Sequence, residues 1–348
     1  MEQFSLRPKL YFGQEPLAAL RELAGKRIFI VTDDFLASSG LLDRVKTRLE
    51  GEVTVFSKVT PDPSLELVAQ GVMAFEQAGA QAMVAFGGGS PMDCAKAIRH
   101  FAKSEVPLWC IPTTAGTGSE VTSFAVLTDT AKGAKHALVD DALLPQAAVL
   151  APEFLAGVPA SVTADTGMDV LTHAAEAYVA RKANAFTDCL AEKAFVTAFQ
   201  KLPAACRGDM AAKAAMLEAS CQAGMAFNAA GLGVCHSLAH ALGGAYHLPH
   251  GRINAILLPH VMAWHVETAR ESAAKYGQLA KMCGLAPTVR ALISGLRRLA
   301  RSIGEPERFP KEIDIHRIAA QAVTDRCTDT DPAAVTESGL RTILEGLR

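Results

Sequence analysis

Four short apolar runs in the first third of the chain most constrain its fold, because helix-length segments separate them. The runs span residues 27–32, 53–56, 82–86 and 107–111. Residues 64–78, between the second and third runs, place apolar side chains at the spacing of an amphipathic helix. Buried strands that alternate with helices form a parallel sheet covered by helices. This part of the chain therefore predicts an α/β domain.

The composition changes near residue 162, where the chain becomes rich in Ala, Leu, Met, Glu and Lys and strand-like runs disappear. Helix-breaking residues divide the rest of the chain into helix-length pieces; the breakers are Pro203, Gly208 and Gly231. A chain of 348 residues is also too long for one ordinary core. We therefore predict two domains, an α/β domain over residues 1–153 and an all-helical domain over residues 154–348.

Charge and cysteine content exclude several classes of protein. The 34 Lys and Arg residues nearly balance the 36 Asp and Glu residues, so the basic face of a nucleic-acid-binding protein is not expected. The eight cysteines are scattered and form no CxxC pair, which argues against a disulfide framework or a structural zinc site. We expect reduced, mostly buried thiols in a cytoplasmic protein.

No targeting or membrane segment is expected. The N-terminal residues lack the apolar core of a signal peptide. The longest apolar stretch, residues 142–160, is interrupted by three prolines and contains no run of about 18 apolar residues. We expect a soluble protein with no membrane partner.

The first candidate site is the segment GGGSPMD, residues 87–93, which comes after the third apolar run and begins a predicted helix over residues 92–101. Glycines let the backbone approach a phosphate, and a helix N-terminus offers free N–H groups and a positive dipole. The candidate contacts are Gly87, Gly88, Gly89 and Ser90. The segment is not GxGxxG, and a purely structural turn from strand to helix is the alternative.

The second candidate site is the segment PTTAGTGSE, residues 112–120, which comes after the fourth apolar run. Its hydroxyls and glycines suit contacts to phosphate or ribose, although a solvated Ser/Thr loop would look the same. Both segments come directly after strands of one parallel sheet, and the carboxyl ends of such strands form a ligand crevice.

An acidic residue at the end of the first strand is a third candidate. Asp33 can bind ribose hydroxyls and repel a 2′-phosphate. Asp34 is its neighbour, so spacing alone does not choose between them. An ordinary helix N-cap is the alternative reading of Asp33.

Asp169 and His173 stand four residues apart in an apparent helix, which places them on one face where both could reach one ion. A single pair of this kind is more often structural, but the histidine pattern further along changes that judgement. His236 and His240 form a second pair with the same spacing, and His250 comes after a Gly-Gly and a Pro.

Six of the ten histidines lie between residues 236 and 265 of an otherwise apolar helical region. That density is hard to explain by core packing. Three imidazoles and one carboxylate suit Fe²⁺ or Zn²⁺ with a coordination position left for substrate. The remaining histidines of this region are interpreted as structural or surface residues; they are His247, His260 and His265.

Taken in order, these motifs resemble the iron-dependent (group III) alcohol dehydrogenases over nearly the whole chain. The most specific segments are GMDVLTHAAEAYV and HSLAHALGGAYHLPHGRINAILLP, supported by GGGSPMDCAKA and PTTAGTGSEVT. The runs FSLRPKLYFGQ, FLASSGLLD and VFSKVTPDPS look most like the 1-propanol dehydrogenases of propanediol-utilising bacterial microcompartments.

The resemblance implies a Rossmann-like N-terminal domain and an all-α C-terminal domain, an architecture similar to dehydroquinate synthase, with the site in the cleft between them. It implies the metal ligands Asp169, His173, His236 and His250. His240 would lie beside the nicotinamide and relay a proton. The implied cofactor contacts are Asp33, Gly87, Gly88, Gly89, Ser90, Asp93, Thr113, Thr114, Thr117 and Lys135. Phe124 and Phe227 would line the substrate pocket.

The activity that the resemblance implies is hydride transfer between NAD(H) and short primary alcohols or aldehydes, such as propanol and propanal, with Fe²⁺ as metal and Zn²⁺ as the alternative. A homodimer or larger oligomer is expected. An aldehyde-producing enzyme or a shell protein is the candidate partner inside a microcompartment. The rival readings are a zinc-dependent polyol or glycerol dehydrogenase, a lyase of the same general fold, and a non-catalytic binding protein of the microcompartment.

Overall fold

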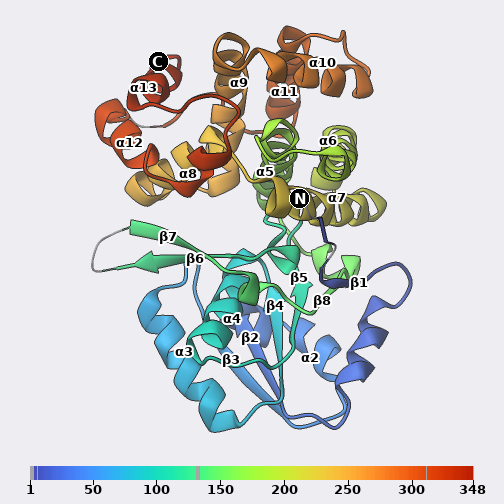
Figure 1. The fold of residues 1–348 in the computed structure, drawn as a ribbon. Helices are drawn as coiled ribbons and strands as arrows, with labels where there is room; N and C mark the ends of the chain where they lie inside the picture. Colours follow the sequence, from blue (N-terminus) through green and yellow to red (C-terminus); the bar gives the residue numbers. More distant parts are fainter. Residues whose placement is uncertain (1–3, 6, 131–133, 311, 348) are drawn as a thin grey trace. The chain divides into compact units, whose positions relative to one another are not determined.

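The computed structural model describes residues 4–5, 7–130, 134–310 and 312–347. The chain divides into two compact units, Met1–Gly157 and Val158–Arg348 (Figure 1). The first unit is built on a parallel sheet, and the second is helical. The predicted fold class, a Rossmann-like α/β region followed by an all-α region, is confirmed.

The sheet of the first unit has six strands in the order β1-β8-β5-β4-β2-β3, all parallel where paired. The strands are β1 (Lys9–Tyr11), β2 (Ile28–Asp33), β3 (Val53–Val59), β4 (Ala82–Gly87), β5 (Leu108–Pro112) and β8 (Ala147–Val149). A separate antiparallel hairpin consists of β6 (Phe124–Asp129) and β7 (Ala134–Val139).

Helices cover both faces of this sheet (Figure 1). The helical elements are η1 (Pro16–Leu23), α1 (Asp34–Ser38), α2 (Leu41–Lys46), α3 (Leu65–Ala78), α4 (Gly89–Phe101), η2 (Ser119–Val121), η3 (Asp141–Leu143) and η4 (Pro152–Leu155). Side chains of β2 alternate between the two cores, because successive side chains of a strand point to opposite faces. Phe29 packs on the α3 and α4 side, and Ile30 packs on the side of η1 and α2.

The four predicted strands correspond to β2, β3, β4 and β5, and the helix predicted over residues 64–78 is α3. The helix predicted from residue 92 begins earlier, at Gly89, because Gly88 is its N-cap. β1, β8 and the β6–β7 hairpin were not expected. They are short or peripheral, and β1 pairs with β8 more than 130 residues away in the sequence, so no local pattern marks them.

Helices make up the second unit over the residues that the structure describes. They are α5 (Ala160–Val179), α6 (Ala185–Cys206), α7 (Met210–Ala230), α8 (Val234–Tyr246), α9 (His250–Thr268), α10 (Arg270–Met282), α11 (Val289–Ser302), α12 (Ile315–Ala322), η5 (Arg326–Thr330) and α13 (Glu337–Glu345). α5 is buried on all sides from Gly167 to Val179, which makes it the central helix of this unit.

Two expectations need correction. Pro203 does not separate two helices but lies inside α6, close to its C-terminal end, where only the last turn loses a hydrogen bond. The cysteines are all free, but only Cys94, Cys110, Cys221 and Cys235 are buried, so "mostly buried" holds for half of them. Among the described residues, no helix is both long and apolar enough to cross a membrane.

Candidate metal and cofactor sites

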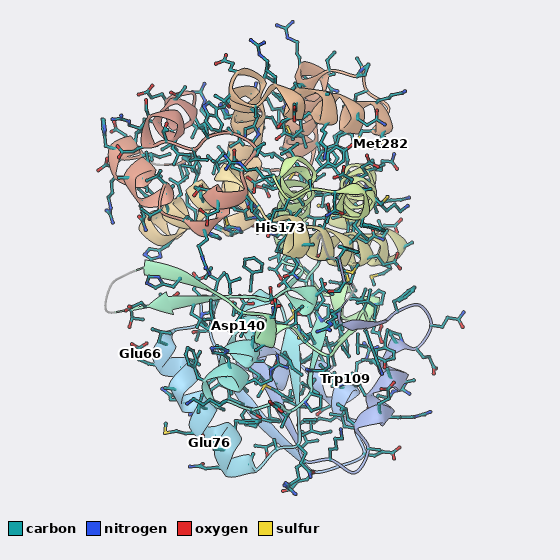
Figure 2. All side chains as sticks on the ribbon, viewed as in Figure 1. Glu66, Glu76, Trp109, Asp140, His173 and Met282 are labelled. Atoms are coloured by element: carbon teal, nitrogen blue, oxygen red, sulfur yellow. The ribbon has the colours of Figure 1, made fainter. Side chains whose placement is uncertain are left out.

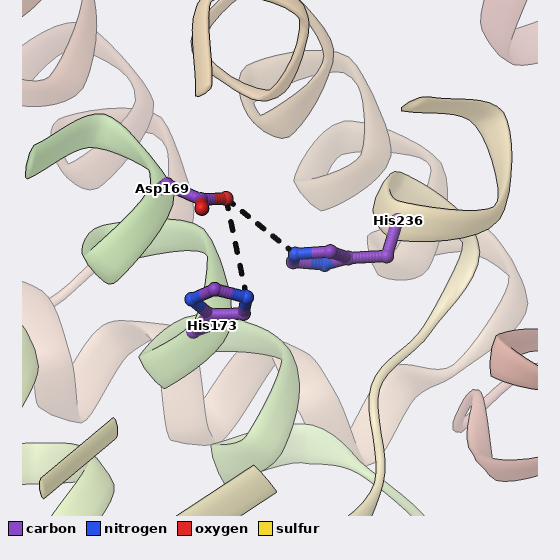
Figure 3. Close-up of side chains that lie close together, drawn as sticks. All are labelled: Asp169, His173 and His236. Atoms are coloured by element: carbon purple, nitrogen blue, oxygen red, sulfur yellow. Dashed lines mark ion pairs between the residues drawn. The ribbon is translucent and has the colours of Figure 1, made fainter. Parts of the chain in front are cut away.

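The central helix α5 presents an acidic residue and a histidine on one face. Asp169 Oδ1 lies 4.0 Å from His173 Nε2, and both side chains are buried. Figure 2 marks His173 within the second unit, and Figure 3 shows the two side chains turned toward each other from successive turns of the helix. The i,i+4 spacing places them together, as the sequence predicts.

Two further imidazoles approach the same oxygen of Asp169. His236, in the first turn of α8, brings Nε2 to 3.6 Å from Oδ1 (Figure 3). His250, the first residue of α9, also places Nε2 at 3.6 Å from that atom. Three helices thus bring one carboxylate and three imidazole Nε2 atoms together. We call Asp169, His173, His236 and His250 the Asp–His cluster.

The separations within this cluster fit a single divalent ion. Donor atoms around one tetrahedral ion, with bonds of about 2.1 Å, lie roughly 3.4 Å apart. The three distances from Asp169 Oδ1, 3.6 to 4.0 Å, are close to that value. Three neutral nitrogen donors and one carboxylate suit Fe²⁺ and Zn²⁺ rather than Mg²⁺ or Ca²⁺, which prefer oxygen.

The charges of the cluster are strongly coupled. Burial opposes ionisation of Asp169, but His173, His250 and His236 outweigh it and hold the pKa of that carboxyl well below its usual range. Burial lowers the pKa of His250 to about 3. Burial also acts to lower the pKa of His236, yet the negative charges of Glu176 and Asp169 raise it to about 9. The cluster therefore favours an ionised carboxylate beside His250 in its neutral form.

Two residues that the sequence analysis missed hold the cluster in place. Glu176 Oε2 lies 2.5 Å from His236 Nδ1, and its other oxygen accepts the backbone N–H of Cys235 at 2.7 Å. Asn254 donates to Asp169 Oδ1 at 2.8 Å. Spacing offered a signal for both, because Glu176 stands three residues after His173 and Asn254 stands four after His250.

His240 and Phe227 border the cluster. The His240 ring stacks on that of His250, with centroids 5.4 Å apart, and its Nδ1 bonds to Asp325 instead of joining the cluster. Phe227, in α7, is buried and stacks on the His173 ring at 4.5 Å. Phe227 thus lies beside the cluster, and Phe124 lies in β6 of the first unit; their place in a substrate pocket stays a prediction.

The two polar loops of the first unit lie against each other. Thr113 donates its backbone N–H to the carbonyl of Gly87 at 3.0 Å. A side chain on Gly88 would come within 3.2 Å of Thr114, and one on Gly89 within 2.9 Å of Thr117. Gly87 has φ +153, and a Cβ there would lie 2.4 Å from Pro91. The glycines therefore allow close contact between loops at the N-terminus of α4, where Ser90 lies in the first turn.

Both carboxylate oxygens of Asp93 accept hydrogen bonds from within the protein. Its two oxygens accept the hydroxyl of Ser119 at 2.6 Å and the N–H of Val126 at 2.9 Å. Buried Lys96 donates to Ser119 and to the carbonyl of Phe124, each at 2.8 Å. These contacts fasten the second loop and β6 to α4. Lys135 belongs to β7, but its side chain lies outside the described residues.

Asp33 ends β2 and serves as the N-cap of α1, where Oδ1 accepts the N–H of Leu36 at 2.8 Å. The alternative reading of this residue as a helix cap is therefore correct. Capping uses one oxygen and leaves a carboxylate at the carboxyl end of a central strand of the sheet, so it does not exclude a contact with ribose. Asp34 is exposed in the first turn of the same helix.

Comparison with known proteins identifies the family. The sequence model of the iron-containing alcohol dehydrogenases matches residues 8–152, and that of the C-terminal region of the Fe-containing alcohol dehydrogenase family matches residues 163–347. The 1-propanol dehydrogenase PduQ of Citrobacter freundii is 42% identical, and the alignment covers 100% of both chains. The NAD-dependent methanol dehydrogenase of Bacillus methanolicus is 36% identical over 99% of both.

A solved structure of a 1,3-propanediol oxidoreductase superimposes with a TM-score of 0.94 at 33% identity, covering 100% of both chains. The family predicted from the motifs is therefore confirmed: the chain belongs to the iron-containing alcohol dehydrogenases and is an alcohol dehydrogenase.

Proposed function

We propose that this chain interconverts short primary alcohols and their aldehydes, with NAD(H) as redox cofactor and Fe²⁺ held by the Asp–His cluster. The observation that carries the proposal is the approach of three imidazole Nε2 atoms to one buried carboxylate oxygen, at 3.6 to 4.0 Å. A divalent ion there would act as a Lewis acid that makes an alcohol hydroxyl more acidic and polarises an aldehyde carbonyl.

The protein's own groups orient the cluster and move the proton. Glu176 accepts from His236 Nδ1, so in the neutral ring the lone pair lies on Nε2, where a metal could bind it. His240, next to the cluster but outside it, is the proposed proton relay: its Nε2 accepts the hydroxyl proton during alcohol oxidation and returns a proton during aldehyde reduction. Phe227 covers one face of His173 and limits the room for substrate.

The first unit is the proposed cofactor domain, and the second is the proposed catalytic domain. The N-terminus of α4, with Gly87 to Ser90 and the threonine loop against it, offers backbone N–H groups and hydroxyls for a pyrophosphate. We assign Thr113, Thr114 and Thr117 to this contact and Lys135 to the nicotinamide side. Asp93 contributes by holding Ser119 and Val126 in place. NAD(H) supplies the hydride acceptor or donor.

Asp33 is the proposed determinant of NAD(H) over NADP(H), because its carboxylate would repel a 2′-phosphate. Asp33→Asn keeps an oxygen that can cap α1 but removes the charge. We expect the ratio of kcat/KM for NADH to that for NADPH to fall roughly tenfold, which corresponds to about 1.4 kcal/mol. The exposed neighbour provides the control, since Asp34→Asn should leave the ratio unchanged. The reverse result would transfer the role to Asp34.

Short substrates are proposed because Phe227, whose ring stacks on His173 of the cluster, is assigned to the pocket. The likeness of the N-terminal runs to the propanediol-utilisation enzymes supports propanal and propanol among them. The same likeness supports residence in a bacterial microcompartment, beside an aldehyde-producing enzyme or a shell protein. Co-purification of the chain with assembled shells tests that part of the proposal.

Metal removal tests the function. The protein should lose aldehyde-dependent NADH oxidation on chelation and regain it with anaerobic Fe²⁺ more fully than with Zn²⁺. Propanal and acetaldehyde should exceed dihydroxyacetone, the product of a glycerol dehydrogenase, in kcat/KM. Full turnover by metal-free protein would overturn the assignment. A preference for dihydroxyacetone with Zn²⁺ would support the polyol alternative instead.

A further inference from the structure

A carboxylate from a distant segment contacts His240. Asp325, the N-cap of η5, places Oδ2 at 2.9 Å from His240 Nδ1, although the two residues are 85 positions apart. The other oxygen, Oδ1, accepts the backbone N–H of Cys327 at 2.8 Å. Both side chains are largely covered, with exposed fractions of 19% for His240 and 22% for Asp325. Each carboxylate oxygen therefore has a defined partner, and the Cys327 side chain makes a further hydrogen bond to the carboxylate.

The charge of Asp325 decides which nitrogen of His240 carries the proton. Burial opposes ionisation, but the hydrogen bond and positive charge of His240, together with Cys327, lower the pKa of Asp325 to about 2. An ionised carboxylate only accepts hydrogen bonds, so the proton of a neutral His240 must lie on Nδ1. Its Nε2 then carries the lone pair, and among the described residues none bonds to that atom.

We propose that Asp325 is a positioning residue that fixes His240 in the tautomer with the hydrogen on Nδ1 and the lone pair on Nε2. The inference rests on the proposed function, in which His240 relays the proton. The arrangement parallels the one at the metal cluster, where Glu176 contacts His236 Nδ1 with one oxygen and a backbone N–H with the other. In α8, His236 of the first turn would thus be oriented to bind a metal, and His240, one turn later, would be oriented to accept a proton.

The backbone N–H of Cys327 makes a sharp test possible. In Asp325→Asn, that N–H should hold the amide oxygen, so the amide NH₂ faces His240 Nδ1 and donates to it. Nδ1 must then be the acceptor, and Nε2 carries the hydrogen in the neutral ring. In Asp325→Ala the ring can take either tautomer. We therefore expect the nearly isosteric Asn variant to be less active than the Ala variant, with kcat reduced about 10- to 100-fold and the KM for aldehyde little changed.

A role in packing alone predicts the opposite order, because Ala removes more contacts than Asn does. The matched control is Asp329→Asn, which removes one charge from the same segment at an exposed position and should keep the activity of the unmodified enzyme. Bound metal and melting temperature are measured for every variant. An active, metal-loaded Asn variant, or one impaired less than Ala, would overturn the inference.

A double-mutant cycle separates this inference from the function on which it rests. In a His240→Ala background, Asp325→Asn should reduce kcat no further, because the ring through which it acts is gone. Additive losses would show that Asp325 acts elsewhere and would reject the inference. Absence of metal-dependent aldehyde reduction in the unmodified enzyme would instead reject the proposed function.

Discussion

At the scale of single residues, Glu176 orients a proposed metal ligand through one contact. Its oxygen lies 2.5 Å from His236 Nδ1, while Cys235 N–H occupies the other oxygen. In Glu176→Gln, that N–H should hold the amide oxygen and turn the NH₂ toward Nδ1, which moves the hydrogen of the neutral ring onto Nε2. We expect metal affinity to fall about 10- to 100-fold, measured by competition with a chromogenic chelator. Unchanged affinity would mean that the carboxylate of Glu176 does not orient His236 for metal binding.

Glu120 should make the stability of the first unit depend on pH. Its carboxyl is buried, Oε1 has no hydrogen-bond partner among the described residues, and burial raises its pKa to about 7, against the opposing effects of its backbone N–H and Lys96. The native state therefore binds a proton that the unfolded state releases near pH 4.5. The stability that this proton contributes is fully present below pH 4.5 and is lost as the pH rises to about 7.

Glu120→Gln should remove that loss, because a neutral amide replaces the protonated acid. Melting temperatures of the variant and the unmodified protein should agree near pH 4.5. At pH 8 the variant should melt several degrees higher, because its free energy of unfolding should exceed that of the unmodified protein by up to about 3 kcal/mol. Glu76→Gln, an exposed change in α3, is the control for removal of one acidic side chain. A difference that does not change with pH would contradict the assignment.

Individual residues differ in how far sequence could identify them. Asp169 and His173 share a helix, so spacing alone placed them together. Glu176 and Asn254 lie on the same helices as two cluster residues, at three- or four-residue spacing, and could have been found in the same way. Asp325 could not, because it reaches His240 across 85 residues and from a short turn that no periodicity marks.

At the scale of elements, the N-terminus of α8 is held by two buried carboxylates. Asp331 accepts the N–H of Val234 at 2.9 Å, and Glu176 accepts that of Cys235 at 2.7 Å. Free N–H groups and the positive end of the helix dipole favour negative charge there. Gly233 lets both carboxylates approach, since a Cβ would lie 2.6 Å from Asp331 and 2.9 Å from Glu176.

Gly233→Ala should therefore displace the first turn of α8 and with it His236. We expect a loss of about 1–3 kcal/mol in stability and a weaker affinity for metal, measured by thermal unfolding and chelator competition. Gly244→Ala lies in the same helix, in open space, and should instead stabilise it by about 0.5–1 kcal/mol with normal metal binding. Equal behaviour of the two variants would count against this account.

Elements with strong local patterns were predictable, and those that depend on remote partners were not. The continuous apolar runs gave β2, β4 and β5, because strands buried on both faces are apolar throughout. The breakers Gly208 and Gly231 have positive φ at helix ends, but Pro203 does not end α6. A proline near the end of a helix destabilises the helix little, so the position of Pro203, and not its presence, decides whether α6 ends there.

At the scale of the whole molecule, we expect the two compact units to respond to different ligands. The proposed cofactor contacts lie mainly in Met1–Gly157, whereas the Asp–His cluster lies in Val158–Arg348. The chain has two tryptophans, and each unit contains one. Trp109 is in β5 and stacks on Tyr11 at 5.3 Å, and Trp264 is buried in α9. Fluorescence can therefore follow the unfolding of each unit separately.

Single-tryptophan variants should show which unit each ligand stabilises. In Trp109→Phe, the remaining Trp264 should report a melting temperature that rises with anaerobic Fe²⁺ or with Zn²⁺, because a metal in the Asp–His cluster would join α5, α8 and α9. At a free metal concentration a thousandfold above Kd, the gain is about 4 kcal/mol, a shift on the order of 10 °C. In Trp264→Phe, Trp109 should respond to NADH and much less to metal. As a control, His236→Ala should abolish the response of Trp264 to metal and leave the response of Trp109 to NADH unchanged. Equal shifts of both tryptophans with either ligand would show that the chain unfolds as one cooperative unit.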